Sequence, residues 1–263
     1  SARNGNLLFL MITFENVTKA FGGPPVLDGV SFSIEPGETF VIVGPSGAGK
    51  SVSLKHMVRM LTPDSGRVLV GEDVVSEAGG TELERIRKRF GYLFQGGALL
   101  AWLNVTENVA LPLREKTSLD DDEIMEKVNR TLELVGLKND GDKVPAEISG
   151  GMRKRAGLAR AIIGEPEIIL YDEPTSGLDP VTSRTIDYLI ERLRSELGVT
   201  GVVVTHDLHS ALSIGTRIGM LYGGKILEMS EPESFVNSSV SEVQGFLESQ
   251  FITRQGPWER KRE

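Results

Sequence analysis

The chain has 263 residues, 40% hydrophobic and 25% charged, a balance that is typical of folded globular proteins and excludes wholesale disorder. Its 29 Lys and Arg against 37 Asp and Glu give a formal net charge of −8, which argues against a dedicated nucleic-acid binder, so we expect no nucleic acid among its partners. The absence of cysteine excludes disulfides, thiol nucleophiles and cysteine-ligated metal sites.

Short strands and tight turns are predicted at the start of the chain. Residues 1–10 precede Met11 and do not read as a secretory signal, so we interpret them as a remnant of cloning or an alternative start. Strands are predicted over 12–17, 31–34 and 67–70, separated by turns rich in glycine and proline.

A buried strand, a glycine-rich loop and a helix are predicted next. The run 40–43 (Phe-Val-Ile-Val) is apolar without alternation, as expected for a strand buried on both faces of a parallel sheet. After the loop, apolar residues recur at helical spacing, at Leu54, Met57, Val58 and Leu61. The loop itself matches the complete P-loop pattern with Gly44, Pro45, Ser46, Gly47, Ala48, Gly49, Lys50 and Ser51.

This P-loop predicts a site for ATP. Its glycines allow successive backbone N–H groups to surround phosphate oxygens, and the following helix N-terminus adds N–H donors and a positive dipole end. We expect Lys50 to reach the β- and γ-phosphates, Ser51 to ligate Mg²⁺ and Val52 to lie beside them. A glycine-rich turn without a ligand is the alternative, which the strand and helix on either side disfavour.

Strand and helix signals alternate again after residue 164. The runs 168–171 and 202–204 are typical of buried strands. A helix between them is predicted to begin at Asp179-Pro180, with Ile186, Leu189, Ile190 and Leu193 as its buried stripe. We infer an α/β fold with a mostly parallel sheet.

The stretch of about 96–164 has little strand signal and is interpreted as a helical subdomain inserted into this core. One helical face is expected at Ile124, Val128, Leu132 and Val135.

Two carboxylates follow the predicted strand at 168–171. Asp172 is placed to organise Mg²⁺ through its waters, and Glu173 to polarise the attacking water. Acidic residues at the end of a strand are by themselves weak evidence for a catalytic site. The presence of a P-loop in the same chain strengthens this interpretation.

The other motifs resemble those of ATP-binding cassette (ABC) proteins. They are Ser149, Gly150 and Gly151 in the signature, Asp172 to Asp179 in the Walker B motif and D-loop, Gln95 in the Q-loop, His206 as the switch histidine, and Phe21 as the aromatic that stacks on adenine. The resemblance implies an ABC ATPase domain over 11–233, with a P-loop NTPase (RecA-like) core, an N-terminal antiparallel β subdomain and the inserted α-helical subdomain at about 96–164. Residues 234–263 would form a C-terminal helical extension.

The resemblance also implies a composite catalytic site between two copies of the chain. Each ATP would lie between one P-loop and the signature of the other copy, with Asp179 nearby. Glu173 would act as base or water-orienting group, His206 would contact the γ-phosphate, and Gln95 would assist at Mg²⁺. Plainer roles stay open: Ser149 as a helix cap, Phe21 in core packing, and Gln95 and His206 as structural residues.

Several details resemble the ATPases of bacterial phospholipid-trafficking systems that work with MCE-domain proteins (MlaF-like). These are Met152, Tyr171, the stretch 95–99 (QGGAL) and the stretch 107–115 (ENVALPLRE). The implied partners are a second copy, two membrane permease subunits (MlaE-like) and an MCE-domain protein, with a small regulatory subunit as a further candidate.

The implied location is the cytoplasmic face of the inner membrane. No apolar run approaches the roughly 20 residues that span a bilayer, so attachment is expected to be peripheral. The alternatives are the ATPase of another ABC importer or exporter, for amino acids or lipoproteins, and, less favoured, a soluble ABC ATPase outside transport.

The C-terminal extension carries one predicted helical face, with Val236, Val240, Val243 and Leu247. It is expected to pack on its own core or on the partner copy. Arg254, Arg260, Lys261 and Arg262 give it a basic end, interpreted as a solvated tail, with dimer or lipid-headgroup contact as alternatives.

Overall fold

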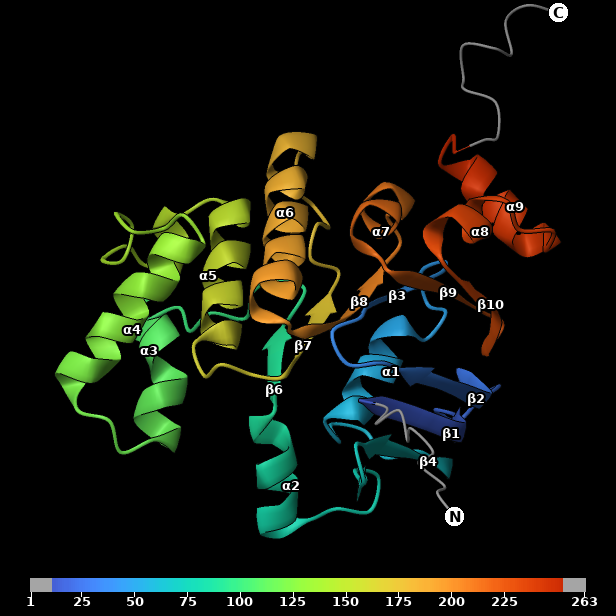
Figure 1. Ribbon diagram of the computed structural model, residues 1–263, viewed down its shortest axis with the longest axis horizontal. Coiled ribbons are helices and arrows are strands. Elements are labelled where there is room, and N and C mark those ends of the chain that lie inside the picture. Colours follow the sequence, from blue (N-terminus) through green and yellow to red (C-terminus); the bar gives the residue numbers. More distant parts are fainter. Residues whose placement is uncertain (1–10, 253–263) are drawn as a thin grey trace, which may run out of the picture.

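Two β-sheets organise residues 11–252, the part of the chain that the computed structural model describes (Figure 1). The strands are β1 (Ile12–Lys19), β2 (Leu27–Ile34), β3 (Thr39–Val43), β4 (Ser65–Val70), β5 (Asp73–Val74), β6 (Phe90–Leu93), β7 (Ile168–Asp172), β8 (Thr200–Thr205), β9 (Arg217–Tyr222) and β10 (Lys225–Ser230). The helices are α1 (Lys50–Met57), α2 (Gly80–Lys88), α3 (Val105–Lys116), α4 (Asp121–Leu134), α5 (Gly150–Ile162), α6 (Pro180–Leu197), α7 (Leu208–Ile214), α8 (Pro232–Val236) and α9 (Ser241–Ser249), with a 3₁₀ turn at Pro145–Glu147. Residues 1–10, interpreted above as a remnant of cloning or an alternative start, and the basic end at 254–262 lie outside the described residues.

The central six-stranded sheet has the order β10-β9-β3-β8-β7-β6, and every neighbouring pair except β10 and β9 is parallel. Its strands bury alternate side chains in two apolar layers. In β3, Phe40 and Ile42 join the layer shared with α1 and the N-terminal strands, whereas Val41 and Val43 join the layer shared with the later helices. The predicted α/β fold with a mostly parallel sheet is confirmed.

The register of this sheet brings three loops together at one edge. Val43 pairs with Thr205, and Asp172 pairs with Val204. Because β3, β7 and β8 are parallel, the residues that follow them leave the sheet side by side. The P-loop, Glu173 and His206 therefore meet at the carboxyl edge.

A four-stranded antiparallel sheet with the order β2-β1-β4-β5 covers one side of this core. Phe14 and Phe32 stack with ring centroids 4.5 Å apart, and Phe32 lies 5.3 Å from Phe40 of the central sheet. These rings join the two sheets into one apolar layer, so the predicted N-terminal antiparallel β subdomain is also confirmed.

Helices α3, α4 and α5 occupy the chain between β6 and β7, where no strand is described. Ile124, Val128 and Leu132 of α4 are buried, as their spacing predicts. The exact limits of the subdomain at 96–164 and of the units 11–233 and 234–263 stay predictions.

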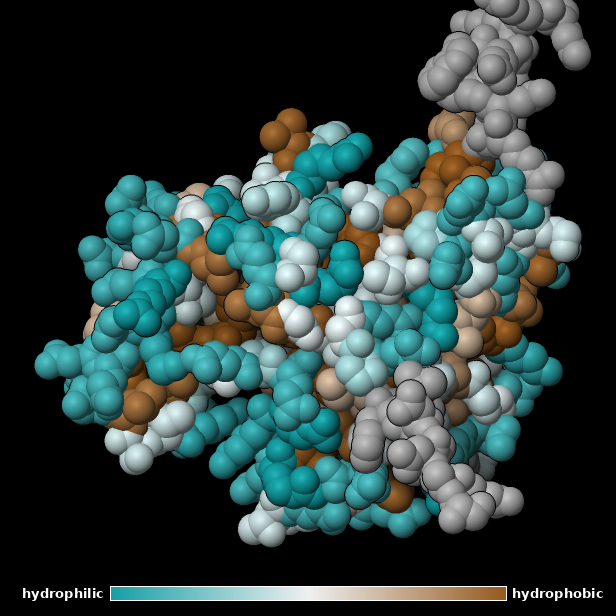
Figure 2. All heavy atoms as spheres, viewed as in Figure 1, coloured by the Kyte–Doolittle hydropathy of each residue, from teal (hydrophilic) through white to brown (hydrophobic). Residues whose placement is uncertain are grey.

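Hydrophilic residues cover most of the face seen in Figure 2. None of the described helices has both the length and the apolar composition needed to cross a bilayer.

Two predicted helical stripes are not carried by one continuous helix each. Helix α1 stops at Met57, so Leu61 lies outside it, because Arg59 takes a left-handed backbone conformation with φ 50°. The predicted face from Val236 to Leu247 is divided between α8 and α9. Its residues pack against the chain's own core, which agrees with the first of the two expectations for the extension.

Candidate nucleotide-binding site

The P-loop turns sharply between β3 and α1. Gly44 has φ 150° and Gly49 has φ 101°. A Cβ at Gly44 would lie 2.2 Å from the Leu221 carbonyl oxygen, and one at Gly49 would lie 2.8 Å from Val26 Cγ1. Only glycine fits either position. As N-cap of α1, Gly49 offers no side chain to the first helical amides, so these N–H groups remain available to phosphate oxygens.

Lys50 lies inside this loop. Its Nζ donates to the carbonyl oxygens of Gly44 at 2.8 Å and Pro45 at 3.1 Å, and it lies 3.8 Å from Glu173 Oε1. Burial lowers the pKa of Lys50, while Glu173 and Asp172 act in the opposite direction. The lysine is thus held at the loop and beside the Walker B acids.

Ser51 and Asp172 form the oxygen donor set expected for Mg²⁺. Ser51 Oγ donates to Asp172 Oδ1 at 2.7 Å, and the Tyr92 hydroxyl lies 3.4 Å from Asp172 Oδ2. Burial and the nearby Asp172 raise the pKa of Tyr92, which keeps its proton for this hydrogen bond. No group of three or more His, Cys, Asp or Glu among the described residues could enclose a metal. Mg²⁺ suits such a site, since it is commonly bound by one or two protein oxygens together with substrate phosphates.

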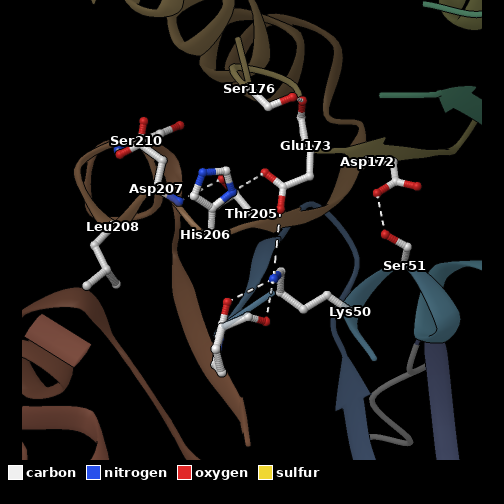
Figure 3. A network of polar contacts seen from close by, with 12 residues as sticks. Lys50, Ser51, Asp172, Glu173, Ser176, Thr205, His206, Asp207, Leu208 and Ser210 are labelled. Atoms are coloured by element: carbon white, nitrogen blue, oxygen red, sulfur yellow. Dashed lines mark hydrogen bonds and ion pairs between the residues drawn. The ribbon is translucent and has the colours of Figure 1, made fainter. Parts of the chain in front are cut away.

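Glu173 and His206 face each other across the carboxyl edge of β7 and β8 (Figure 3). His206 Nδ1 lies 2.8 Å from Glu173 Oε2. The Glu173 side chain is 12% exposed and that of His206 is 55% exposed. A largely buried carboxylate therefore lies between Lys50 on one side and a solvent-accessible imidazole on the other.

One lysine in this region was missed by the sequence reasoning. Lys154 of α5 is buried, and its Nζ donates to the Glu173 carbonyl oxygen at 2.7 Å and to Ser176 Oγ at 3.1 Å. The basic run at 153–155 directly after the signature is visible in the sequence, but the spacing does not show which of its residues points inward.

Phe21 and Gln95 are both exposed. Phe21 is 59% exposed, which excludes core packing, and it belongs to the loop that ends at Val26 beside Gly49. Gln95 follows β6 and makes no hydrogen bond or ion pair with Ser51 or Asp172, so its expected metal contact stays a prediction.

Within the described residues, the signature and Asp179 make their hydrogen bonds at the starts of α5 and α6 and not with Lys50, Glu173 or His206. Ser149 is exposed and caps α5, its side chain accepting from Met152 N at 3.2 Å. Asp179 caps α6, accepting from Val181 N and Thr182 N, each at 3.0 Å. Both predicted helix starts are thus found. No hydrogen bond or ion pair links Ser149, Gly150, Gly151 or Asp179 to the P-loop within the described chain.

Comparison with known proteins gives a consistent assignment. Residues 27–176 match the family model described as ABC transporter. The chain is 41% identical over 252 residues to the probable ribonucleotide transport ATP-binding protein mkl of Mycobacterium leprae (strain TN), covering 96% of this chain and 73% of the relative. It is 37% identical over 238 residues to the intermembrane phospholipid transport system ATP-binding protein MlaF of Escherichia coli (strain K12), covering 90% and 88%.

Methionine importers and solved cassettes are also similar. The methionine import ATP-binding protein MetN of Clostridium tetani (strain Massachusetts / E88) is 38% identical over 240 residues, covering 91% of this chain and 75% of the relative. A dimeric structure of the ATP-binding cassette MJ0796 bound to ADP and Pi superposes with a TM-score of 0.79 at 33% identity, covering 84% of this chain and 99% of that one. The motifs, the fold and these similarities show that this chain belongs to the ATP-binding family of ABC transporters, which hydrolyse ATP to drive transport.

Proposed function

We propose that this chain is the ATPase of a phospholipid transport system and works as a dimer. In this proposal it lies at the cytoplasmic face of the inner membrane, with two permease subunits and an MCE-domain protein. The observation that supports the catalytic part is the position of Glu173, with Oε2 2.8 Å from His206 Nδ1 and Oε1 3.8 Å from Lys50 Nζ.

The residues divide the work of phosphoryl transfer to water. Glu173 orients the attacking water and accepts its proton, and His206 contacts the γ-phosphate from the neighbouring strand. Lys50 neutralises charge on the β- and γ-phosphates, and Phe21 stacks on the adenine. Ser51 and Asp172 would hold Mg²⁺, which when bound supplies charge neutralisation at the phosphate oxygens, with Gln95 as the further candidate ligand.

The second half of the site comes from another copy of the chain. Ser149, Gly150 and Gly151 begin a helix whose N-terminal amides are suited to a phosphate group, and Asp179 lies at the start of α6 beside them. The MJ0796 cassette was solved as a dimer, which supports this arrangement.

The phospholipid assignment is supported by the MlaF relatives and by the stretches 95–99 and 107–115. The MlaF proteins of Haemophilus influenzae and Escherichia coli are 36% and 37% identical to this chain. The MetN relatives favour small-molecule import as the second candidate, since they are 38–40% identical.

One experiment tests both parts of the proposal. The tagged chain is purified from membranes with its bound partners, and ATP hydrolysis and ATP-dependent transfer of a fluorescent phospholipid between vesicles are measured. E173Q should bind ATP but lower turnover by roughly 10²-fold or more, because it removes the proton acceptor. The matched control E191Q changes an exposed carboxylate on α6 and should behave as wild type.

Three results would contradict the proposal. Full turnover by E173Q would show that Glu173 is not the group that orients the attacking water and accepts its proton. Hydrolysis without lipid transfer would refute the phospholipid assignment, as would ATP-dependent methionine uptake by the same assembly.

A further inference from the structure

The end of helix α9 lies against the loop that carries His206. Gln250, the residue that follows α9, places its side-chain amide between two backbone groups of this loop. Leu208 N donates to Gln250 Oε1 at 2.8 Å, and Gln250 Nε2 donates to the His206 carbonyl oxygen at 2.5 Å. A third contact joins His209 Nε2 to the Gln250 carbonyl oxygen at 3.3 Å.

These contacts complete the start of helix α7. The first amides of a helix have no partner within the helix and need acceptors from elsewhere. Asp207 Oδ1 accepts from His209 N at 3.0 Å and Ser210 N at 3.2 Å. The remaining amide, Leu208 N, donates to the side chain of Gln250. Among side chains of this length, a neutral amide supplies both the acceptor for Leu208 N and the donor for the His206 carbonyl.

Gln250 is held in place by an anchored pair of helices. Phe235 of α8 and Val243 and Leu247 of α9 are buried in the apolar layer that also contains Val41 and Met220 of the central sheet. Figure 1 places these helices beside α7 and β9. Residues 232–250, which include α8, α9 and Gln250, are therefore anchored to the core and make a fixed contact with the loop.

The His206 side chain itself has little support. It is 55% exposed, and its ring contacts Glu173 through Nδ1. Its backbone carbonyl is bonded to Gln250, and the next amide, Asp207 N, donates to Thr205 Oγ1 at 3.0 Å, so Gln250 is one of two contacts that hold the backbone from which the ring projects.

We infer that Gln250 is a positioning residue for His206, through which the C-terminal extension sets the rate of ATP hydrolysis. This inference rests on the proposed role of His206 at the γ-phosphate. When Gln250 holds the loop, His206 stays next to Glu173 in the geometry that hydrolysis requires. When α9 shifts or Gln250 is lost, the loop gains freedom and turnover falls, while the P-loop and ATP binding are unaffected.

The test compares Q250A and Q250E with Q244A in the whole chain. Gln244 lies on the same helix, but its amide donates to Ser238 O at 2.7 Å and Val236 O at 3.4 Å within the extension, without contact to the His206 loop. Q250E retains an acceptor for Leu208 N and loses the donor to the His206 carbonyl. The measurements are kcat and KM for ATP, amide hydrogen exchange over residues 206–211 and the melting temperature.

We expect Q250A and Q250E to lower kcat on the order of 10-fold with KM nearly unchanged, because a displaced catalytic group affects the transition state more than ATP binding. Exchange over 206–211 should accelerate in Q250A, and Q244A should match wild type in kcat and in this exchange. A wild-type kcat in both Gln250 variants, or an equal loss in Q244A, would overturn the inference.

An H206A variant distinguishes failure of the Gln250 inference from failure of the proposed role of His206 in hydrolysis. If H206A abolishes turnover while both Gln250 variants turn over normally, the positioning role fails and the proposed site stands. If H206A itself hydrolyses ATP as fast as wild type, the role of His206 fails, and the inference fails with it.

Discussion

Glu173 holds its position through an unusual backbone conformation. Its φ of 50° lies in the left-handed region, which is uncommon for a residue with a side chain. Three donors converge on its carbonyl oxygen: Lys154 Nζ at 2.7 Å, Ser176 Oγ at 3.0 Å and Ser176 N at 3.2 Å. Its own N–H donates to the Val204 carbonyl at 2.9 Å. We infer that these bonds offset the backbone strain and fix the direction of the carboxylate.

Lys154 gives this arrangement a pH dependence. Burial lowers the pKa of Lys154 from its ordinary 10.5 to about 8. Between these two values the unfolded chain holds a proton that the folded chain has lost, so the free energy of unfolding rises with pH in that window. K154M removes this titration. The free energy of unfolding of wild type relative to K154M should therefore increase by up to about 1.4 kcal/mol per pH unit between pH 8 and 10.

Urea denaturation of both proteins from pH 6 to 10 measures this difference. The control K127M changes a lysine that is 39% exposed and pairs with Glu165 at the surface, so it should leave the slope unchanged. A wild-type advantage that stays flat or falls above pH 8 would contradict the buried, partly deprotonated state of Lys154.

Residues of the site differ in how well the sequence predicts them. The P-loop, Asp172 and Glu173 are set by short motifs at strand ends, and the structure brings Lys50, Ser51 and both acids together. The bonds from Lys154 to Glu173 and from Gln250 to His206 span 19 and 44 residues. Such contacts depend on how α5 and α9 pack, which no local pattern encodes.

At the scale of elements, hydrogen bonds from Asn108 of α3 fix the loop at 100–104, which follows Gln95 in the chain. The Asn108 side chain is fully buried; Oδ1 accepts from Leu100 N at 2.7 Å. Its Nδ2 lies 3.0–3.1 Å from the carbonyl oxygens of Leu100, Leu103 and Asn104. The same helix begins with a capping box formed by Asn104 and Glu107. The loop at 100–104, including Trp102 at 76% exposure, is therefore fixed to α3.

Removing the side-chain amide of Asn108 should destabilise the folded protein. N108A leaves the half-buried Leu100 N and the three carbonyls without their side-chain partner and empties a fully buried position, so we expect the free energy of unfolding to fall by about 2–4 kcal/mol. The control E115A removes an exposed side chain near the end of the same helix and should change stability by less than about 0.5 kcal/mol. Urea denaturation at pH 7.5 measures both, and a loss below 1 kcal/mol for N108A would contradict the anchoring role.

Helix starts were predicted better than helix ends. Ser149 and Asp179 cap α5 and α6 as predicted, because an N-cap depends on one side chain and the next few amides. Helix α1 ends at Met57 beside the left-handed Arg59, and a break between Val236 and Ser241 separates α8 from α9. Apolar spacing continues through both breaks and so cannot reveal them.

At the scale of the molecule, one chain holds only part of the proposed site. Lys50, Asp172, Glu173 and His206 gather at the carboxyl edge of the central sheet. The signature begins α5 and packs against the start of α6, where a Cβ at Gly151 would lie 2.3 Å from Thr182 Cγ2. Since Ser149 is exposed and bonded to nothing at the P-loop, its proposed role requires a second copy.

Mixing two inactive variants tests this requirement. K50A lacks the P-loop lysine, and S149F blocks the signature with an exposed bulky side chain at a cost of about 1 kcal/mol for the lost cap. Each variant alone should be inactive. In a mixed dimer, one site combines the intact P-loop of the S149F chain with the intact signature of the K50A chain. Random pairing should restore about a quarter of wild-type turnover, because half the dimers are mixed and each has one intact site of two.

The matched control mixes K50A with E173Q. Lys50 Nζ and Glu173 Oε1 are 3.8 Å apart in one chain, so both changes damage the same half of a site. Every site in that mixture retains one of the two lesions, and ATP hydrolysis should stay at the background of the separate variants. No recovery with K50A and S149F would place Ser149 outside the catalytic site, because only a site divided between chains can be restored by exchanging halves. Recovery in the control would instead contradict the assignment of Lys50 and Glu173 to the same half of one site.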